Sequence, residues 1–153
     1  FFALIGMIYG RTHTRDITKL GGLLKVMPFI SVIYVIAGLA SLGLPGFSGF
    51  IAEMNIFVGA FQHEEMFYRV ATVISVSAIV VTAVYILRVL GIMLMGEVKN
   101  EEFLDLQKAT WFEITGILLL LVPMIGMGVA PLWLSDMTMD SLQPFIQGVL
   151  NHL

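Results

Sequence analysis

Apolar residues form long runs along this chain, and short polar segments separate the runs. Residues 26–62 contain one charged side chain, Glu53, residues 70–96 contain only Arg88, and residues 114–135 contain none. A helix needs about 20 apolar residues to cross a hydrocarbon core about 30 Å thick. The second and third runs therefore each predict one membrane-crossing helix. The first run is too long for one ordinary crossing and barely long enough for two.

The first run is interrupted near its middle by Pro45, Gly46 and Gly49. Proline removes a backbone hydrogen-bond donor and clashes with the preceding turn, and glycine loosens the backbone, so a helix is expected to break here. In one arrangement, residues 28–44 and 48–62 are the two halves of a single discontinuous crossing. In the other, they form a hairpin of two short crossings.

Lysine and arginine are distributed unevenly among the polar segments. A discontinuous crossing over residues 28–62 places loops 11–25 and 97–112 on one side of the membrane, with six Lys and Arg against one on the other side, whereas a hairpin gives five against two. Because cytoplasmic loops carry the excess of Lys and Arg, the count favours the discontinuous crossing. It also predicts that loop 11–25 is cytoplasmic and that the C-terminus lies outside. The six cations are Arg11, Arg15, Lys19, Lys25, Lys99 and Lys108.

Both ends of the chain predict further helical structure. Residues 1–10 are apolar and lead directly into a polar loop, which is typical of the last part of a membrane helix, so we expect a piece of a longer protein. Near the other end, apolar residues recur at the spacing of one helical face and predict an amphipathic helix over residues 140–152. Such a helix fits the membrane interface or a protein neighbour. Its apolar positions are Leu142, Phe145, Ile146, Val149, Leu150 and Leu153.

The composition indicates that lipid is the surrounding medium. Hydrophobic residues make up 58% of the chain and charged residues 12%, with a mean hydropathy of +0.94, whereas soluble proteins average about 45–50% and about 25%. These values exclude a disordered chain, a nucleic-acid-binding module and almost every soluble enzyme. The absence of cysteine excludes a disulfide framework and an iron–sulfur cluster. The predicted fold is an all-α, polytopic transmembrane bundle with one discontinuous helix.

Glu53 is the strongest candidate for a functional residue. At a rise of 1.5 Å per residue it lies about 14 Å from the Gln62 end of its helix, which is close to the centre of the membrane. Ionisable side chains at that depth face a bundle interior or water and mark ion or proton paths. The preceding helix break frees backbone groups that can hold water or ions, as in many transporters. The alternative is a protonated, hydrogen-bonded glutamate with no role in transport.

Two further side chains are candidates for a proton path. Arg88 either extends to the cytoplasmic interface or pairs with an acid on another helix. His13 has a pKa suited to proton entry, although a loop histidine can equally be a surface or capping residue. The cluster His63-Glu64-Glu65 is interpreted as a solvated turn, because adjacent residues at a helix end do not converge on one metal ion. The sequence predicts no metal site and contains no nucleotide-binding motif.

Two segments carry a specific family resemblance. Residues 9–16 read YGRTHTRD, and residues 42–53 read LGLPGFSGFIAE. This combination resembles the antiporter-like, proton-conducting membrane subunits of respiratory complex I, and among them chain M of bacterial NADH:quinone oxidoreductase, the counterpart of mitochondrial NADH dehydrogenase subunit 4. At the position of Glu53, chain L of that family usually has lysine, whereas chain M has glutamate. The resemblance covers the whole chain and is strongest over residues 9–62.

The resemblance implies a function and a setting. It implies proton translocation in the inner (cytoplasmic) membrane of a bacterium, coupled to NADH–quinone electron transfer elsewhere in the complex. It implies no cofactor in this chain, with NAD, flavin, iron–sulfur clusters and quinone held by partner subunits. The expected partners are the other membrane subunits and the lipid bilayer, and no nucleic acid. A cation/proton antiporter or membrane-bound hydrogenase subunit of the same superfamily is the main alternative, and a purely structural membrane scaffold is a third.

Overall fold

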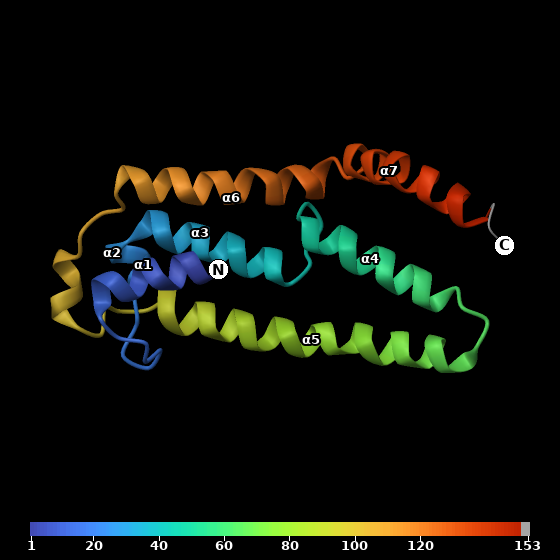
Figure 1. Cartoon of the computed structure of the whole chain (residues 1–153). Helices are drawn as coiled ribbons and strands as arrows, with labels where there is room; N and C mark the ends of the chain where they lie inside the picture. Colours follow the sequence, from blue (N-terminus) through green and yellow to red (C-terminus); the bar gives the residue numbers. More distant parts are fainter. Residues whose placement is uncertain (151–153) are drawn as a thin grey trace.

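A computed structural model describes residues 1–150 of the chain, and the side chains at 105, 134, 141, 145–147, 149 and 150 are not described. Within these residues the backbone is helical and contains no strand, which confirms the predicted all-α bundle (Figure 1). The elements are α1 (Phe2–Thr12), α2 (Leu23–Val26), α3 (Pro28–Ser41), α4 (Ser48–Phe61), α5 (Met66–Leu94), the 3₁₀ helix η1 (Glu101–Asp105), α6 (Trp111–Val129) and α7 (Leu132–Leu150).

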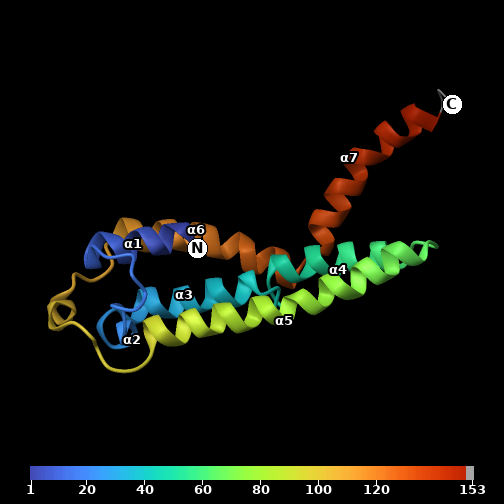
Figure 2. The same cartoon turned by 90° about the horizontal axis from the view of Figure 1, so that it is seen from below.

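The discontinuous helix is formed, and the hairpin is not. Helix α4 continues in the direction of α3, and both views show the two halves in succession along the bundle (Figures 1 and 2). Residues 42–47 between them are not helical. Gly43 and Gly46 adopt φ values of 65° and 100°, which glycine reaches without steric cost. Gly49 lies in the first turn of α4 rather than in the break. A Cβ built on Gly49 would be 3.1 Å from the carbonyl oxygen of Ala40.

The later helices differ in their bounds from the predicted segments. Helix α5 begins at Met66, before the predicted segment 70–96. Helix α6 begins at Trp111 and ends at Val129, so the predicted segment 114–135 extends past the end of this helix. Helix α6 ends here because Ala130 precedes Pro131, and a residue before proline disfavours helical backbone angles. Ala130 accordingly has φ −127° and ψ 68°.

The tail helix α7 is longer than the predicted segment 140–152. It begins at Leu132, directly after Pro131, and Pro144 lies inside it. It leaves the bundle at an angle (Figure 2). Most of the apolar face expected for this helix falls on side chains that are not described, namely Phe145, Ile146, Val149, Leu150 and Leu153.

The hydrophobic core lies at one end of the bundle. Residues 13–22 and 95–110 meet at this end, which we call the loop end: Lys99 Nζ donates to the carbonyl oxygen of Thr18 at 2.8 Å, and the N–H of Gly22 donates to the carbonyl oxygen of Met95 at 3.2 Å. The two basic loops therefore share one end of the molecule, as expected for the discontinuous crossing. The buried apolar residues nearby include Leu4, Ile8, Leu20, Leu23, Ile30, Ile33, Tyr34, Ile86, Leu90, Met93, Leu94 and Phe103.

The opposite half of the molecule exposes apolar surface. In that half, helix α4 has no buried residue, and the first part of α5 is mostly exposed. Helix α6, which runs from the loop end to the break, is also mostly exposed, and both α5 and α6 are long and apolar enough to cross a membrane. In water such faces would be covered, since exposed apolar area is costly. They suit a helix surrounded by lipid or by other membrane helices.

Candidate proton site at the helix break

Glu53 lies in the second turn of α4, close to the break in the discontinuous helix. Its side chain is half-buried. The carboxyl group lies against the backbone of Gly43, because a Cβ built on Gly43 would clash with Oε2 of Glu53 and come within 2.9 Å of its Cδ. Two segments ten residues apart are thereby brought together, and the carboxyl group sits beside the end of α3 rather than pointing away from it.

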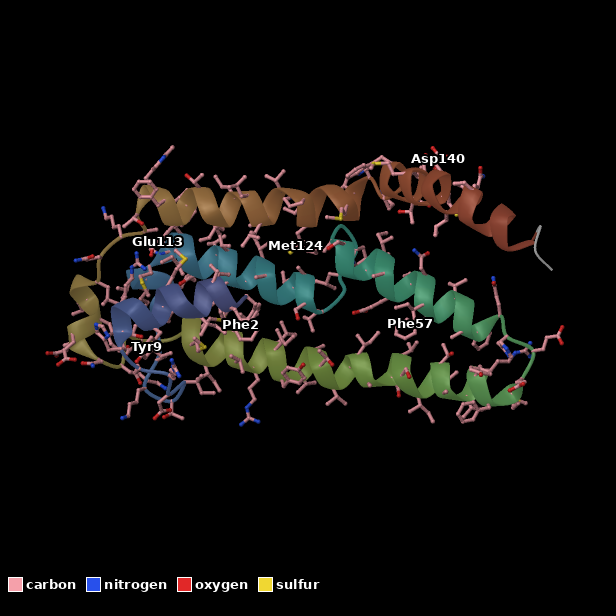
Figure 3. All side chains as sticks on the ribbon, viewed as in Figure 1. Phe2, Tyr9, Phe57, Glu113, Met124 and Asp140 are labelled. Carbon is pink, nitrogen blue, oxygen red and sulfur yellow. The ribbon has the colours of Figure 1, made fainter. Side chains whose placement is uncertain are left out.

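A cavity of about 580 Å³ lies between α4 and α5, and Glu53 contributes to its wall. Figure 3 shows Phe57 of α4 in the space between these two helices. Among the described residues that line the cavity, Glu53 is the only ionisable one, and no hydrogen bond from another described residue reaches its carboxyl group. The remaining lining residues are Leu42, Gly43, Phe50, Met54, Phe57, Val58, Phe61, Gln62, Thr72, Val73, Val76 and Ile79.

Arg88 is not brought to Glu53. Ile86 and Leu90 are buried, and their side chains would contact a Cβ at Gly38 of α3 at 3.4 and 3.1 Å. Because successive helical residues turn by 100°, Arg88 points to the opposite side of α5, where it is exposed. Within the described part of the chain, Arg88 forms no ion pair.

His13 caps α1 at the loop end. It adopts the left-handed conformation with φ 51°, and its N–H donates to the carbonyl oxygen of Tyr9 at 2.8 Å. Its ring is exposed and lies edge-on to Tyr9, with centroids 6.3 Å apart. The 14 residues of α3, about 21 Å of helix, separate the loop end from the break. His13 and Glu53 are therefore not brought together.

An ion pair between Arg11 and Glu113 joins α1 to α6, and sequence reasoning missed it. The guanidinium forms two parallel hydrogen bonds with the carboxylate, at 3.0 and 2.6 Å. Figure 3 shows Glu113 at the start of α6, beside α1. The carboxylate also accepts from the N–H of Thr110 at 2.7 Å and from its hydroxyl at 2.9 Å. The spacing Thr110-x-x-Glu113 before an apolar run is the signal of a capping box and could have identified this glutamate.

Comparisons with known proteins identify the family. Residues 1–82 match the family described as NADH:quinone oxidoreductase/Mrp antiporter, TM. The chain belongs to this family. It is similar to NADH-quinone oxidoreductase subunit M of Rickettsia felis, with 35% identity over 130 residues, which cover 85% of this chain and 26% of that protein. It is also similar to NAD(P)H-quinone oxidoreductase chain 4 1 of Trichormus variabilis, with 36% identity over 142 residues, or 89% of this chain and 27% of that protein.

A third relative extends over nearly the whole chain. NAD(P)H-quinone oxidoreductase chain 4 of Prochlorococcus marinus is 32% identical in an alignment 153 residues long, which covers 95% of this chain and 27% of that protein. The chain thus spans about a quarter of the length of the curated relatives that it matches. The family is one of antiporter-like membrane subunits, as the two sequence segments indicated.

Proposed function

We propose that the protein is a proton-translocating membrane subunit of NADH:quinone oxidoreductase and that Glu53 carries the proton near the membrane midplane. The observation that supports this most strongly is a single carboxyl group beside a helix break, on the wall of an otherwise non-ionisable cavity. Such a group is costly to keep in an apolar environment and has no hydrogen-bond donor among the described residues. A role in taking up and releasing a proton accounts for its presence.

The proton must enter and leave this site alternately. Moving one charge across 100 mV costs about 2.3 kcal/mol, so an open path would dissipate the gradient. In the proposed mechanism Glu53 takes up a proton from one side and releases it to the other. The break provides backbone groups that can hold a water chain to either side. His13 and Arg88 remain candidates for the entry side of the path, acting through residues other than Glu53.

The energy for this cycle would come from partner subunits. We propose that these subunits oxidise NADH and reduce quinone, and that they hold the flavin, iron–sulfur clusters and quinone site. The exposed apolar faces of α4, α5 and α6 fit lipid and other membrane subunits as neighbours. The setting proposed is the inner membrane of a bacterium, with the loop end in the cytoplasm.

Substitution of Glu53 tests the proposal in the full-length subunit assembled in its complex. Glu53→Gln keeps the size and hydrogen-bonding capacity of the side chain but removes the titratable proton, so assembly should be retained. Proton translocation in sealed inverted vesicles and the coupled quinone reduction should fall at least about tenfold, within the range of effects for a proton-transferring group. Glu53→Asp should retain part of the activity, because the acid remains.

Glu64→Gln is the matched control, because it is the same substitution at an exposed position in the turn between α4 and α5. It should leave both rates unchanged. A normal proton-to-electron ratio and rate for Glu53→Gln would mean that Glu53 is structural and that the proposed mechanism is wrong.

A cation/proton antiporter is the second candidate, and the family description itself supports it because it includes Mrp antiporters. The two functions differ in their energy source. An antiporter would exchange Na⁺ or another cation for protons in vesicles without any quinone or NADH. A subunit of the oxidoreductase would move protons only during electron transfer, and cation gradients alone would not drive it.

A further inference from the structure

Gly43 and Gly46 lie in the same break, and both have positive φ, but they differ in their surroundings. At Gly43, with φ 65°, an added Cβ would occupy the place where the carboxyl group of Glu53 now lies. At Gly46, with φ 100°, no atom lies within 4 Å of an added Cβ. Backbone strain alone would therefore permit a side chain at Gly43 at least as readily as at Gly46, since φ near 60° is the accessible left-handed region.

The obstacle at Gly43 is the end of a flexible side chain and not backbone. A Cβ there would be 2.9 Å from Cδ and 3.1 Å from Oε1 of Glu53. The carboxyl group can rotate away into the cavity between α4 and α5, whereas the helices need not move. A substitution at Gly43 should thus displace the carboxyl group and preserve the fold.

We infer that Gly43 is a positioning residue for Glu53: the space left by its missing side chain holds the carboxyl group at the helix break. The inference rests on the proposed function, because a position matters only if Glu53 transfers a proton. From the break, the carboxyl group can exchange protons with water bound to either half of the helix. A carboxyl group displaced from Gly43 would lose this position, and no other ionisable side chain among the described lining residues of α4 and α5 could relay the proton in its place.

The test compares Gly43→Ala with Gly46→Ala in the full-length subunit assembled in its complex. Both variants place an alanine at positive φ, and Gly46→Ala, at φ 100°, carries at least as much backbone strain as Gly43→Ala, at φ 65°. Both should assemble, as judged by the amount of subunit in the purified complex. We expect Gly43→Ala to translocate protons about fivefold more slowly than Gly46→Ala in vesicles, the size of a direct residue–residue coupling. The pH profile of translocation should also differ between the two variants, because only Gly43→Ala changes the environment of the carboxyl group.

Shortening residue 53 provides the second arm. Aspartate is one methylene shorter and withdraws its carboxyl group from Gly43. Gly43→Ala should therefore slow translocation less than about twofold on a Glu53→Asp background, while Gly46→Ala has the same effect on both backgrounds. If Gly43→Ala fails to assemble, the amount of assembled subunit becomes the measured quantity. Adding Glu53→Ala should then restore the assembly of Gly43→Ala, because it removes the carboxyl group that the new Cβ meets. Adding Glu53→Ala to Gly46→Ala should not increase assembly.

The outcomes separate the inference from the proposed function. The inference would be overturned if Gly43→Ala and Gly46→Ala slowed translocation equally, or if the effects of Gly43→Ala and Glu53→Asp on the rate were additive. The proposed function would still stand in that case, provided that Glu53→Gln slows translocation as expected. Normal translocation by Glu53→Gln would instead remove the proposed function. The contact itself would then be tested by the rate at which a lipophilic carbodiimide modifies Glu53, which should rise in Gly43→Ala and stay unchanged in Gly46→Ala.

Discussion

At the scale of single residues, Arg11 shows why an arginine is needed at the loop end. Its guanidinium donates five hydrogen bonds: two to the carboxylate of Glu113 and one each to the carbonyl oxygens of Met7, Gln107 and Lys108. The planar guanidinium matches the carboxylate with two parallel bonds while its remaining N–H groups reach carbonyl oxygens. Both charged side chains are half-buried, with 10% and 27% of their side-chain surface exposed.

Arg11→Lys should destabilise the subunit. Lysine keeps the positive charge but has three donors on one nitrogen and cannot form the paired contact. We expect the free energy of unfolding to fall by about 2 kcal/mol, measured by denaturant titration in detergent. Arg15→Lys is the control: Arg15 is exposed and lies over the ring of Tyr9 at 4.6 Å, a contact that lysine can keep. Equal losses for the two variants would contradict this role of Arg11.

At the scale of elements, the end of α6 is fitted to the break between α3 and α4. Gly128 is buried, and a Cβ there would overlap the carbonyl oxygen of Gly46 and the backbone of Phe47. Backbone atoms cannot rotate away as a side chain can, so this contact requires glycine. Helix α6 therefore supports the break from outside, and the break in turn limits how close α6 approaches.

Gly128→Ala should therefore cost stability where Gly126→Ala does not. Both glycines are helical residues of α6, but nothing lies within 4 Å of a Cβ at Gly126. We expect Gly128→Ala to lower the free energy of unfolding by about 2 kcal/mol through overpacking. Gly126→Ala should raise it by up to about 1 kcal/mol, because alanine favours helix. Denaturant titration of the two variants in detergent measures the difference, and similar values would show that α6 does not depend on this close approach.

At the scale of the whole molecule, the two ends of the bundle differ in how many side chains are buried and in how many cations they carry. The buried core and the basic loops lie at the loop end, while the other half contains α4 and the first half of α5 with exposed apolar faces, together with α7. The turn at residues 62–65 lies at the far end. If the bundle spans a membrane with Lys and Arg in the cytoplasm, these two ends must face opposite compartments.

Cysteine labelling checks that orientation, and the absence of cysteine from this chain makes the experiment direct. In a full-length subunit free of other cysteines, a membrane-impermeant maleimide should label Lys19→Cys only from the cytoplasmic side. Glu64→Cys should react only from the opposite side. Both positions are exposed, so accessibility within each loop is matched. Labelling of both from one side would exclude a single crossing by α3 and α4.

The sequence by itself determined the features that depend on local chemistry. Run length and hydropathy predicted apolar helices, Pro45 and Gly46 predicted the break, and Glu53 was identified because it is the only charge in its run. These features follow from what one segment requires of lipid and of its own backbone, whatever the rest of the chain does. The end of α6 could also have been predicted from Pro131. The predicted segment 114–135 extends beyond Pro131 because it was defined by hydropathy alone.

Tertiary structure decided what each local feature contacts. Arg11 and Glu113 are separated by 102 positions, and Gly128 meets the break from a distant helix. No periodicity encodes such pairs, because they depend on how helices are placed relative to one another. The same placement turned Arg88 away from Glu53 and set the carboxyl group of Glu53 against Gly43. A glycine has no side chain to signal its role in the sequence, and only the packed backbone reveals which group fills the space that it leaves.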